Sequence, residues 1–192
     1  MLRFEPDVSS ADWFAQSGEP WGELVTMGPA GFGSYARVRD PDEDRISQRV
    51  LFARLRVHLA GQANTPGGCF HGLWDGAVSR MYGDPARGDL PWFPTSVLAG
   101  PKVRIPQRIP YREYMLFRGR LDEVGQWGAT DPATGSSRDD EIPGPRLLWP
   151  ADRRWFVATD ADSDFTWVGG SEDLVGAVVT DPGLDARRVH PN

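Results

Sequence analysis

Short apolar segments joined by turns are the feature that most restricts how this chain can fold. Lys102–Pro106 and Arg112–Arg118 form one such pair, and Arg154–Thr159 and Phe165–Val168 form another. Because neighbouring strands with short connections favour antiparallel pairing, we expect a mainly antiparallel or mixed sheet. Further strands are expected at Leu2–Pro6, Glu23–Met27, Ser34–Arg39, Cys69–Trp74 and Arg187–His190. The missing regular strand–helix–strand alternation argues against a doubly wound sheet.

The strongest helical pattern runs from about Arg45 to Ala60, after an acidic loop at Asp40–Asp44. Its apolar stripe consists of Ile46, Val50, Ala53 and Val57, with Leu51, Leu55 and Leu59 beside it. Such a stripe is typical of a helix that packs on a core, and Gly61 is suited to end it. Shorter helices are expected near Ser9 or Ser10, over Leu121–Trp127 and over Glu172–Val179, with Ser10 and Ser171 as capping residues.

The length of 192 residues suits one domain spanning residues 1–192. A compact chain of this size hides roughly 70% of its unfolded surface, so its core needs no disulfide or metal. We therefore predict a single α+β domain with two or three helices packed on the sheet. Two stretches near 76–101 and 130–146 are rich in Gly, Pro and polar residues, which predicts irregular loops and little order in the second.

The composition excludes several classes of function. There are 21 basic and 27 acidic residues, a net charge of −6, whereas nucleic-acid binders usually carry a basic surface. The one cysteine, Cys69, cannot form an internal disulfide or a zinc site that needs two cysteines. All the basic residues except Lys102 are Arg, which indicates GC-rich codons and a bacterial source. No targeting segment is evident, and the apolar stretches are far shorter than the roughly 20 residues that span a bilayer. We expect a soluble cytoplasmic protein that binds neither nucleic acid nor membrane.

Alternating carboxylates at Asp160, Asp162 and Asp164 suggest a site for a hard cation such as calcium. However, Phe165 stands where a calcium loop needs glycine, and Ser171 stands where its last carboxylate belongs. Since Asp and Ser also favour turns through local hydrogen bonds, an acidic hairpin turn explains the run more simply. We therefore expect no metal site here.

Cys69 and His71 lie two apart in a predicted strand, so their side chains point to the same face. They could act as nucleophile and base, with Asp75 orienting the imidazole. Such neighbours lie about 6–7 Å apart, too far for the required hydrogen bond, and free Cys is usually buried. The glycines of Gly28–Gly33 match neither dinucleotide- nor phosphate-binding loops, because a strand rather than a helix follows them. No cofactor is expected.

The aromatic pair Trp92-Phe93 lies between two prolines in an otherwise irregular stretch. Either this loop folds back on the domain, or it supplies a recognition surface in which Trp is a common anchor. Arg80 and Arg87 are near enough in sequence to stack on it. Trp92, Phe93, Arg80 and Arg87 are therefore the predicted binding residues. Two acidic patches, Asp40–Asp44 and Asp139–Glu141, are explained by solvation or by a basic partner.

The run from Trp149 to Asp160, followed by Val168-Gly169-Gly170-Ser171, resembles a family of uncharacterised actinobacterial proteins. Four further segments are similar: Gly72–Gly76, Arg112–Gly119, Ala11–Trp13 and Gly28–Phe32. The resemblance covers most of the chain. It implies a single-domain, cytoplasmic bacterial protein, and it implies no catalytic residue.

Two functional hypotheses follow. The first is a non-catalytic binding or interaction protein with a protein partner, regulatory or immunity-like in character, as the acidic balance and the loop aromatics indicate. The alternative is a small hydrolase or transferase that uses scattered Asp, His and Arg residues. The residues available for the second are His58, His71, Asp75, Asp152, Asp160, Asp162 and Asp164. Convergent polar groups in a deep pocket would favour the enzyme, and an acid-rimmed patch at Trp92 and Phe93 would favour the binding protein.

Overall fold

The computed structural model describes residues 1–17, 28–40, 45–62, 68–76, 78, 91–105, 112–160 and 163–190, without the side chains of 45–47. Its strands are β1 (Arg3–Phe4), β2 (Ser34–Arg39), β3 (Cys69–Trp74), β4 (Lys102–Ile105), β5 (Arg112–Gly119), β6 (Leu147–Pro150), β7 (Phe156–Thr159), β8 (Phe165–Gly170) and β9 (Ala186–Val189). Its helices are α1 (Asp12–Ala15), α3 (Arg45–Ala60), α5 (Thr95–Leu98) and α6 (Glu172–Thr180), with 3-10 turns η1 (Val8–Ala11), η3 (Leu121–Glu123) and η4 (Asp139–Glu141). The predicted strand at Glu23–Met27 lies outside the described residues.

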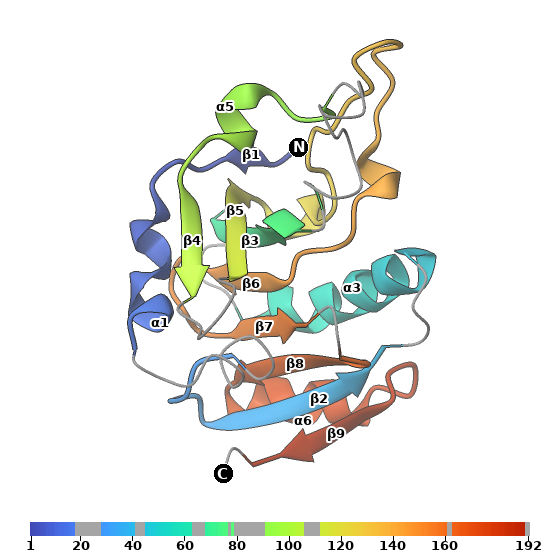
Figure 1. Cartoon of the computed structure of the whole chain (residues 1–192). Helices are drawn as coiled ribbons and strands as arrows, with labels where there is room; N and C mark the ends of the chain where they lie inside the picture. The colour runs from blue at the N-terminus through green and yellow to red at the C-terminus, as the bar shows by residue number, and fades with distance from the viewer. Residues whose placement is uncertain are drawn as a thin grey trace.

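The described strands form one nine-stranded sheet in the order β1-β5-β3-β6-β7-β8-β2-β9 (Figure 1). The short strand β4 pairs with the first half of β5, beside β1, which pairs with the end of β5. Every named pair is antiparallel. This arrangement confirms the predicted α+β class and the mainly antiparallel sheet.

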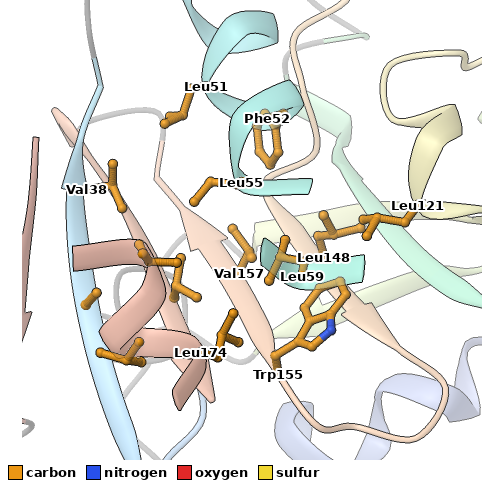
Figure 2. Packing of buried hydrophobic residues seen from close by; sticks show 14 of the residues in the cluster. Val38, Leu51, Phe52, Leu55, Leu59, Leu121, Leu148, Trp155, Val157 and Leu174 are labelled. Carbon is orange, nitrogen blue, oxygen red and sulfur yellow. The ribbon is translucent and has the colours of Figure 1, made fainter. Parts of the chain in front are cut away.

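Helices α3 and α6 cover one face of the sheet. Leu51, Leu55 and Leu59 of α3 are at most 3% exposed. They pack with Val157 of β7 and with Trp155, which lies just before that strand (Figure 2). Helix α6 begins where Ser171 Oγ accepts a hydrogen bond from Leu174 N at 3.2 Å, as the sequence predicts.

The predicted stripe of α3 is wrong in its orientation. Val50 and Val57 are 61% and 71% exposed, whereas Phe52, which the stripe omitted, is buried. The helix turns its leucines and Phe52 toward the sheet because these large side chains remove more apolar surface from water than the valines would. The valine side of the helix is left facing outward.

Aromatic side chains from the N-terminal segment cover the opposite face of the sheet. The Phe14 ring lies 5.0 Å from Trp149 and 5.1 Å from Phe156, between ring centroids, and both contacts are edge-to-face. Ser10 does not cap the first helical turn, because Asp7 does so by accepting a hydrogen bond from Ser9 N at 3.0 Å. A third cluster lies at the β3–β5 end of the sheet and includes Leu73, Phe117 and Trp127.

Three further expectations about local structure are corrected. The sequence predicts that Leu147–Trp149 only leads into a turn at Pro150–Arg153, but these residues belong to the central strand β6. Gly169 and Gly170 do not break β8, since a side chain on Gly169 would lie 2.7 Å from the Phe32 ring and glycine is required for this packing. The helix expected over Leu121–Trp127 is only the turn η3, and Gly125 after it has a left-handed φ of 82°.

Within the described residues, no helix combines the length and apolar character needed to cross a bilayer.

Candidate functional site

The loop that carries Trp92 and Phe93 folds back on the domain, which was the first of the two alternatives. Phe93 is 3% exposed, and its ring lies 6.0 Å from that of Phe117 in β5. Trp92 is half-buried against the same cluster, and its carbonyl oxygen accepts a hydrogen bond from Thr130 N at 3.0 Å. Trp92 is therefore the member of the pair that a partner can reach. Arg80 and Arg87 lie outside the described residues.

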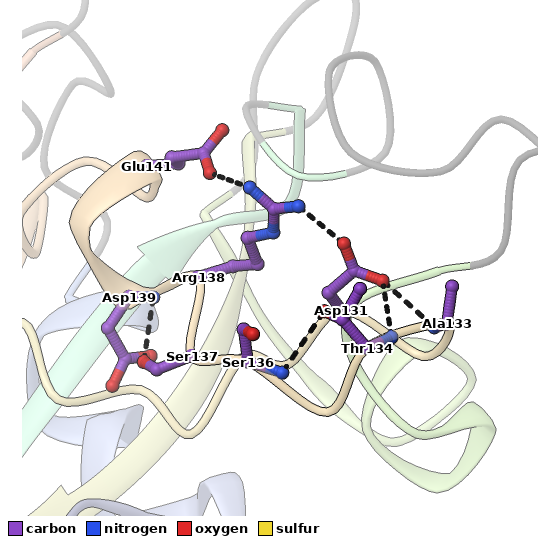
Figure 3. A network of polar contacts seen from close by, with 8 residues as sticks. All are labelled: Asp131, Ala133, Thr134, Ser136, Ser137, Arg138, Asp139 and Glu141. Atoms are coloured by element: carbon purple, nitrogen blue, oxygen red, sulfur yellow. Dashed lines mark hydrogen bonds and ion pairs between the residues drawn. The ribbon is translucent and has the colours of Figure 1, made fainter.

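Among the described residues, Arg138 makes a contact with Trp92 of the kind predicted for Arg80 and Arg87. Its guanidinium carbon lies 5.4 Å from the centroid of the Trp92 ring. The same guanidinium group donates to Glu141 Oε1 at 2.6 Å and to Asp131 Oδ2 (Figure 3). These two hydrogen bonds, with Asp131 the stronger contributor, raise the pKa of Arg138. The cation is thus fixed above the indole.

The loop around Arg138 is ordered by its own hydrogen bonds, although the sequence predicted little order there. Asp131 Oδ1 accepts from Ala133 N at 2.8 Å and from Thr134 N at 3.2 Å. The hydrogen bond from Arg138 is the main reason that the pKa of Asp131 is lowered. On the domain side, Asp139 Oδ1 accepts from Ala129 N at 2.9 Å, and burial raises the pKa of that carboxyl group.

The loop also concentrates negative charge beside Trp92. Residues 131–141 hold four carboxylates and one guanidinium group. Asp140, whose side chain is 85% exposed, pairs with Arg49 of α3, and Glu141 is 43% exposed. We call Trp92, Asp131, Arg138, Asp140 and Glu141 the Trp92 surface. This surface combines residues from the two segments, near 76–101 and 130–146, that the sequence predicts as irregular loops.

A hollow of about 380 Å³ lies between this loop and helix α3. Its apolar lining includes Phe52 and Ile142, and its charged lining includes Arg56, Asp139 and Asp140. The volume falls within the roughly 300–1,000 Å³ typical of small-molecule sites. Through Asp140, the hollow continues the Trp92 surface toward α3.

The residues proposed as nucleophile, base and orienter have surroundings that do not suit these roles. Cys69 and His71 point to the same face of β3, as predicted, but both are fully buried. Burial raises the pKa of the Cys69 thiol to about 12 and lowers the pKa of His71 to about 3. Asp75 pairs instead with Lys102, at 3.3 Å between Oδ1 and Nζ. The thiol therefore lacks the lowered pKa of a reactive cysteine.

The two described carboxylates of the acidic turn after β7, Asp160 and Asp164, lie in different surroundings. Asp160 is 9% exposed and pairs with Arg112 at 3.0 Å, whereas Asp164 is exposed to solvent. The Arg112 guanidinium carbon also lies 4.6 Å from the centroid of the Trp74 ring. Asp162 lies outside the described residues. Across the described ranges, no group of three His, Cys, Asp or Glu side chains is placed to hold a metal ion.

The other groups named for the hydrolase or transferase hypothesis lie apart, each with its own partner. His58 Nε2 lies 2.8 Å from Asp181 Oδ2, and Asp152 pairs with Arg154 at 3.7 Å. The contact of Arg138 with Trp92 escaped the sequence reasoning because the two residues are distant in the chain. The only signal was the position of Arg138 between Asp131 and Glu141.

Comparison with protein-family models, curated proteins and solved structures found no match.

Proposed function

We propose that this protein acts by binding a basic protein partner through the Trp92 surface. The observation that carries the proposal is the contact between Trp92 and Arg138, whose loop also holds four carboxylates. Trp and Arg are the residues most often found as energetic anchors of interfaces. An anchor that is already fixed loses little conformational entropy when the partner binds.

The charge around this anchor specifies the partner. Asp140 and Glu141 are the exposed acids of the surface, and Arg138 is already shared between Asp131 and Glu141. A basic protein surface would gain electrostatic steering from these carboxylates. A regulatory or immunity-like protein that covers the basic nucleic-acid-binding face of an enzyme would need a surface of this kind.

A comparative capture experiment tests the proposal. Immobilised wild-type protein, Trp92→Ala, and the charge-reversal pair Asp140→Lys with Glu141→Lys are each exposed to lysate of the source cells. Asp173→Asn, an exposed acid on α6, serves as the control. We expect a basic protein to be retained by the wild type and the control, to be lost by both other variants, and to be released as salt is raised.

Retention of the same proteins by Trp92→Ala and wild type would contradict the proposal. So would retention that survives both charge reversal and high salt. Circular dichroism of each variant confirms that the fold is kept.

A further inference from the structure

Three arginines gather on the outer face of the last strand pair. Arg37 and Arg39 lie on β2, facing away from Ala36 and Val38, which are buried beneath α3 and α6. Arg187 lies on the edge strand β9, directly opposite Arg37 in the antiparallel register. In Figure 1, β2 and β9 lie at the end of the sheet farthest from β1. We call Arg37, Arg39 and Arg187 the arginine triad.

Among the described residues, no carboxylate forms an ion pair with the triad. Across the described ranges, no carboxylate oxygen lies within 4.0 Å of these three guanidinium groups. Elsewhere on the described part of the chain, carboxylates pair with Arg49, Arg54, Arg104, Arg112, Arg120, Arg138, Arg154 and Arg188. Like charges directly opposite across a strand pair destabilise a sheet. The approach of Arg37 to Arg187 therefore costs stability in the unliganded fold.

The triad surrounds a small hollow. Its volume is about 130 Å³, and its lining consists of the triad, Phe165 and Asp185. The guanidinium carbon of Arg37 lies 4.7 Å from the centroid of the Phe165 ring, which holds this cation at the wall of the hollow. The space corresponds to about four water molecules at liquid density, enough for one polyatomic anion.

We propose that this hollow binds the terminal phosphoryl group of a phosphate monoester. A planar carboxylate is satisfied by one arginine in a bidentate pair, which would leave two arginines of the triad unused. A terminal phosphoryl group presents three oxygens and carries a charge close to −2 at neutral pH. The three arginines and Asp185 together carry a net charge of +2, which matches the charge of the dianion.

A phosphodiester backbone fits this hollow less well. Each diester phosphate carries one negative charge and two free oxygens, so it would leave part of the triad unpaired. The chain as a whole carries a charge of −6, which opposes the approach of an extended polyanion. The hollow is also too small to hold more than the phosphoryl group, so the rest of the ligand must lie along the outer face of β8, β2 and β9.

This inference does not depend on the Trp92 surface. The two regions lie on different elements, and the variants that test one leave the residues of the other intact. Loss of phosphate binding with intact partner capture, or the reverse, would therefore separate the two proposals.

The test titrates the whole protein with phenyl phosphate, inorganic phosphate, dimethyl phosphate, acetate and a single-stranded oligonucleotide. Binding is followed by calorimetry and by the NMR signals of arginine Nε–H groups. The decisive variant is Arg187→Gln. Its matched control is Arg188→Gln, which removes the same charge from the next residue, whose side chain instead pairs with Glu172.

We expect saturable binding of phenyl phosphate, weaker binding of inorganic phosphate, and none of dimethyl phosphate or acetate. Arg187→Gln should weaken phenyl phosphate binding about tenfold, because a hydrogen bond between charged groups is lost, and Arg188→Gln should not. Three results would overturn the proposal: no saturable binding of phenyl phosphate by the wild type, equal loss in both variants, or tighter binding of the oligonucleotide than of either phosphate.

Discussion

Arg138 on the Trp92 surface and Arg187 in the arginine triad carry the same guanidinium group in opposite surroundings. Arg138 donates to two carboxylates and lies over an indole ring, so its charge is compensated within the fold. Arg187 faces Arg37 across the strand pair and has no carboxylate of the described residues within ion-pair distance. The first arginine stabilises its loop, whereas the second faces a like charge, which the proposed anion would offset. The charge of Arg138 therefore maintains the structure, whereas the charge of Arg187 is the one that we propose for a ligand.

The largest expected effect is a loss of stability in the core beneath the Trp92 surface. It distinguishes Phe93, which supports the surface from below, from Trp92, the proposed anchor. Phe93→Ala should destabilise the protein by about 3–5 kcal/mol, because it leaves a cavity beside Phe117. Trp92→Ala should cost much less stability, since its ring is half-buried, while abolishing partner capture. Chemical denaturation of both variants measures the difference. Equal losses of stability would mean that Trp92 belongs to the core and is not an exposed anchor.

Acid should lower the stability of the protein through His71, which lies in the core below the Trp92 surface, before it changes the charge of the arginine triad. The ring of His71 lies 6.5 Å from that of Trp127, and burial holds its pKa at about 3, against 6.5 for an exposed imidazole. Between these values the unfolded chain binds a proton that the native protein does not. The stability contributed by neutral His71 is therefore complete above pH 6.5 and is lost as the pH falls toward 3.

Thermal melts between pH 7.5 and 5.5 measure this effect, because most carboxylates do not titrate in that window. The melting temperature of the wild type should fall with pH, and His71→Leu should remove most of the dependence. A slope that is unchanged in His71→Leu would show that His71 is not the group responsible.

The smallest expected effects have opposite signs in the two regions. Arg138→Gln should lower the melting temperature by about 2 °C, because the stacking contact and both ion pairs are lost. Arg187→Gln should raise it by about 1 °C, since repulsion from Arg37 is relieved. Differential scanning calorimetry at low ionic strength resolves both shifts. If both variants lowered the melting temperature equally, the triad would be as structural as Arg138.

The strands were predicted well where the local pattern alone decides them. β2 and β3 have the bounds that the sequence indicates, because apolar and β-branched residues end there at polar or glycine-rich turns. The orientation of α3 was predicted wrongly, since both of its sides carry apolar residues and only packing chooses between them. The length of β8 was also missed, because glycine breaks a strand unless a neighbouring ring, here Phe32, needs the space.

The sites were harder to predict because they join distant segments. The sequence marks Trp92 and Phe93 as unusual aromatic residues of a loop but gives no way to pair Trp92 with Arg138. Arg37 and Arg39 are visible as alternate residues of one strand, yet Arg187 joins them only through the pairing of β2 with β9. Strand pairing over such separations depends on tertiary contacts that no local pattern records.

The most direct test of the contrast between Arg138 and the arginine triad is the change in melting temperature caused by saturating phenyl phosphate. A ligand that binds only the native state raises this temperature. Phenyl phosphate should raise it for the wild type and for Arg138→Gln, and should raise it clearly less for Arg187→Gln, whose affinity is about tenfold weaker. An equal rise in all three proteins, or no rise in the wild type, would contradict the account.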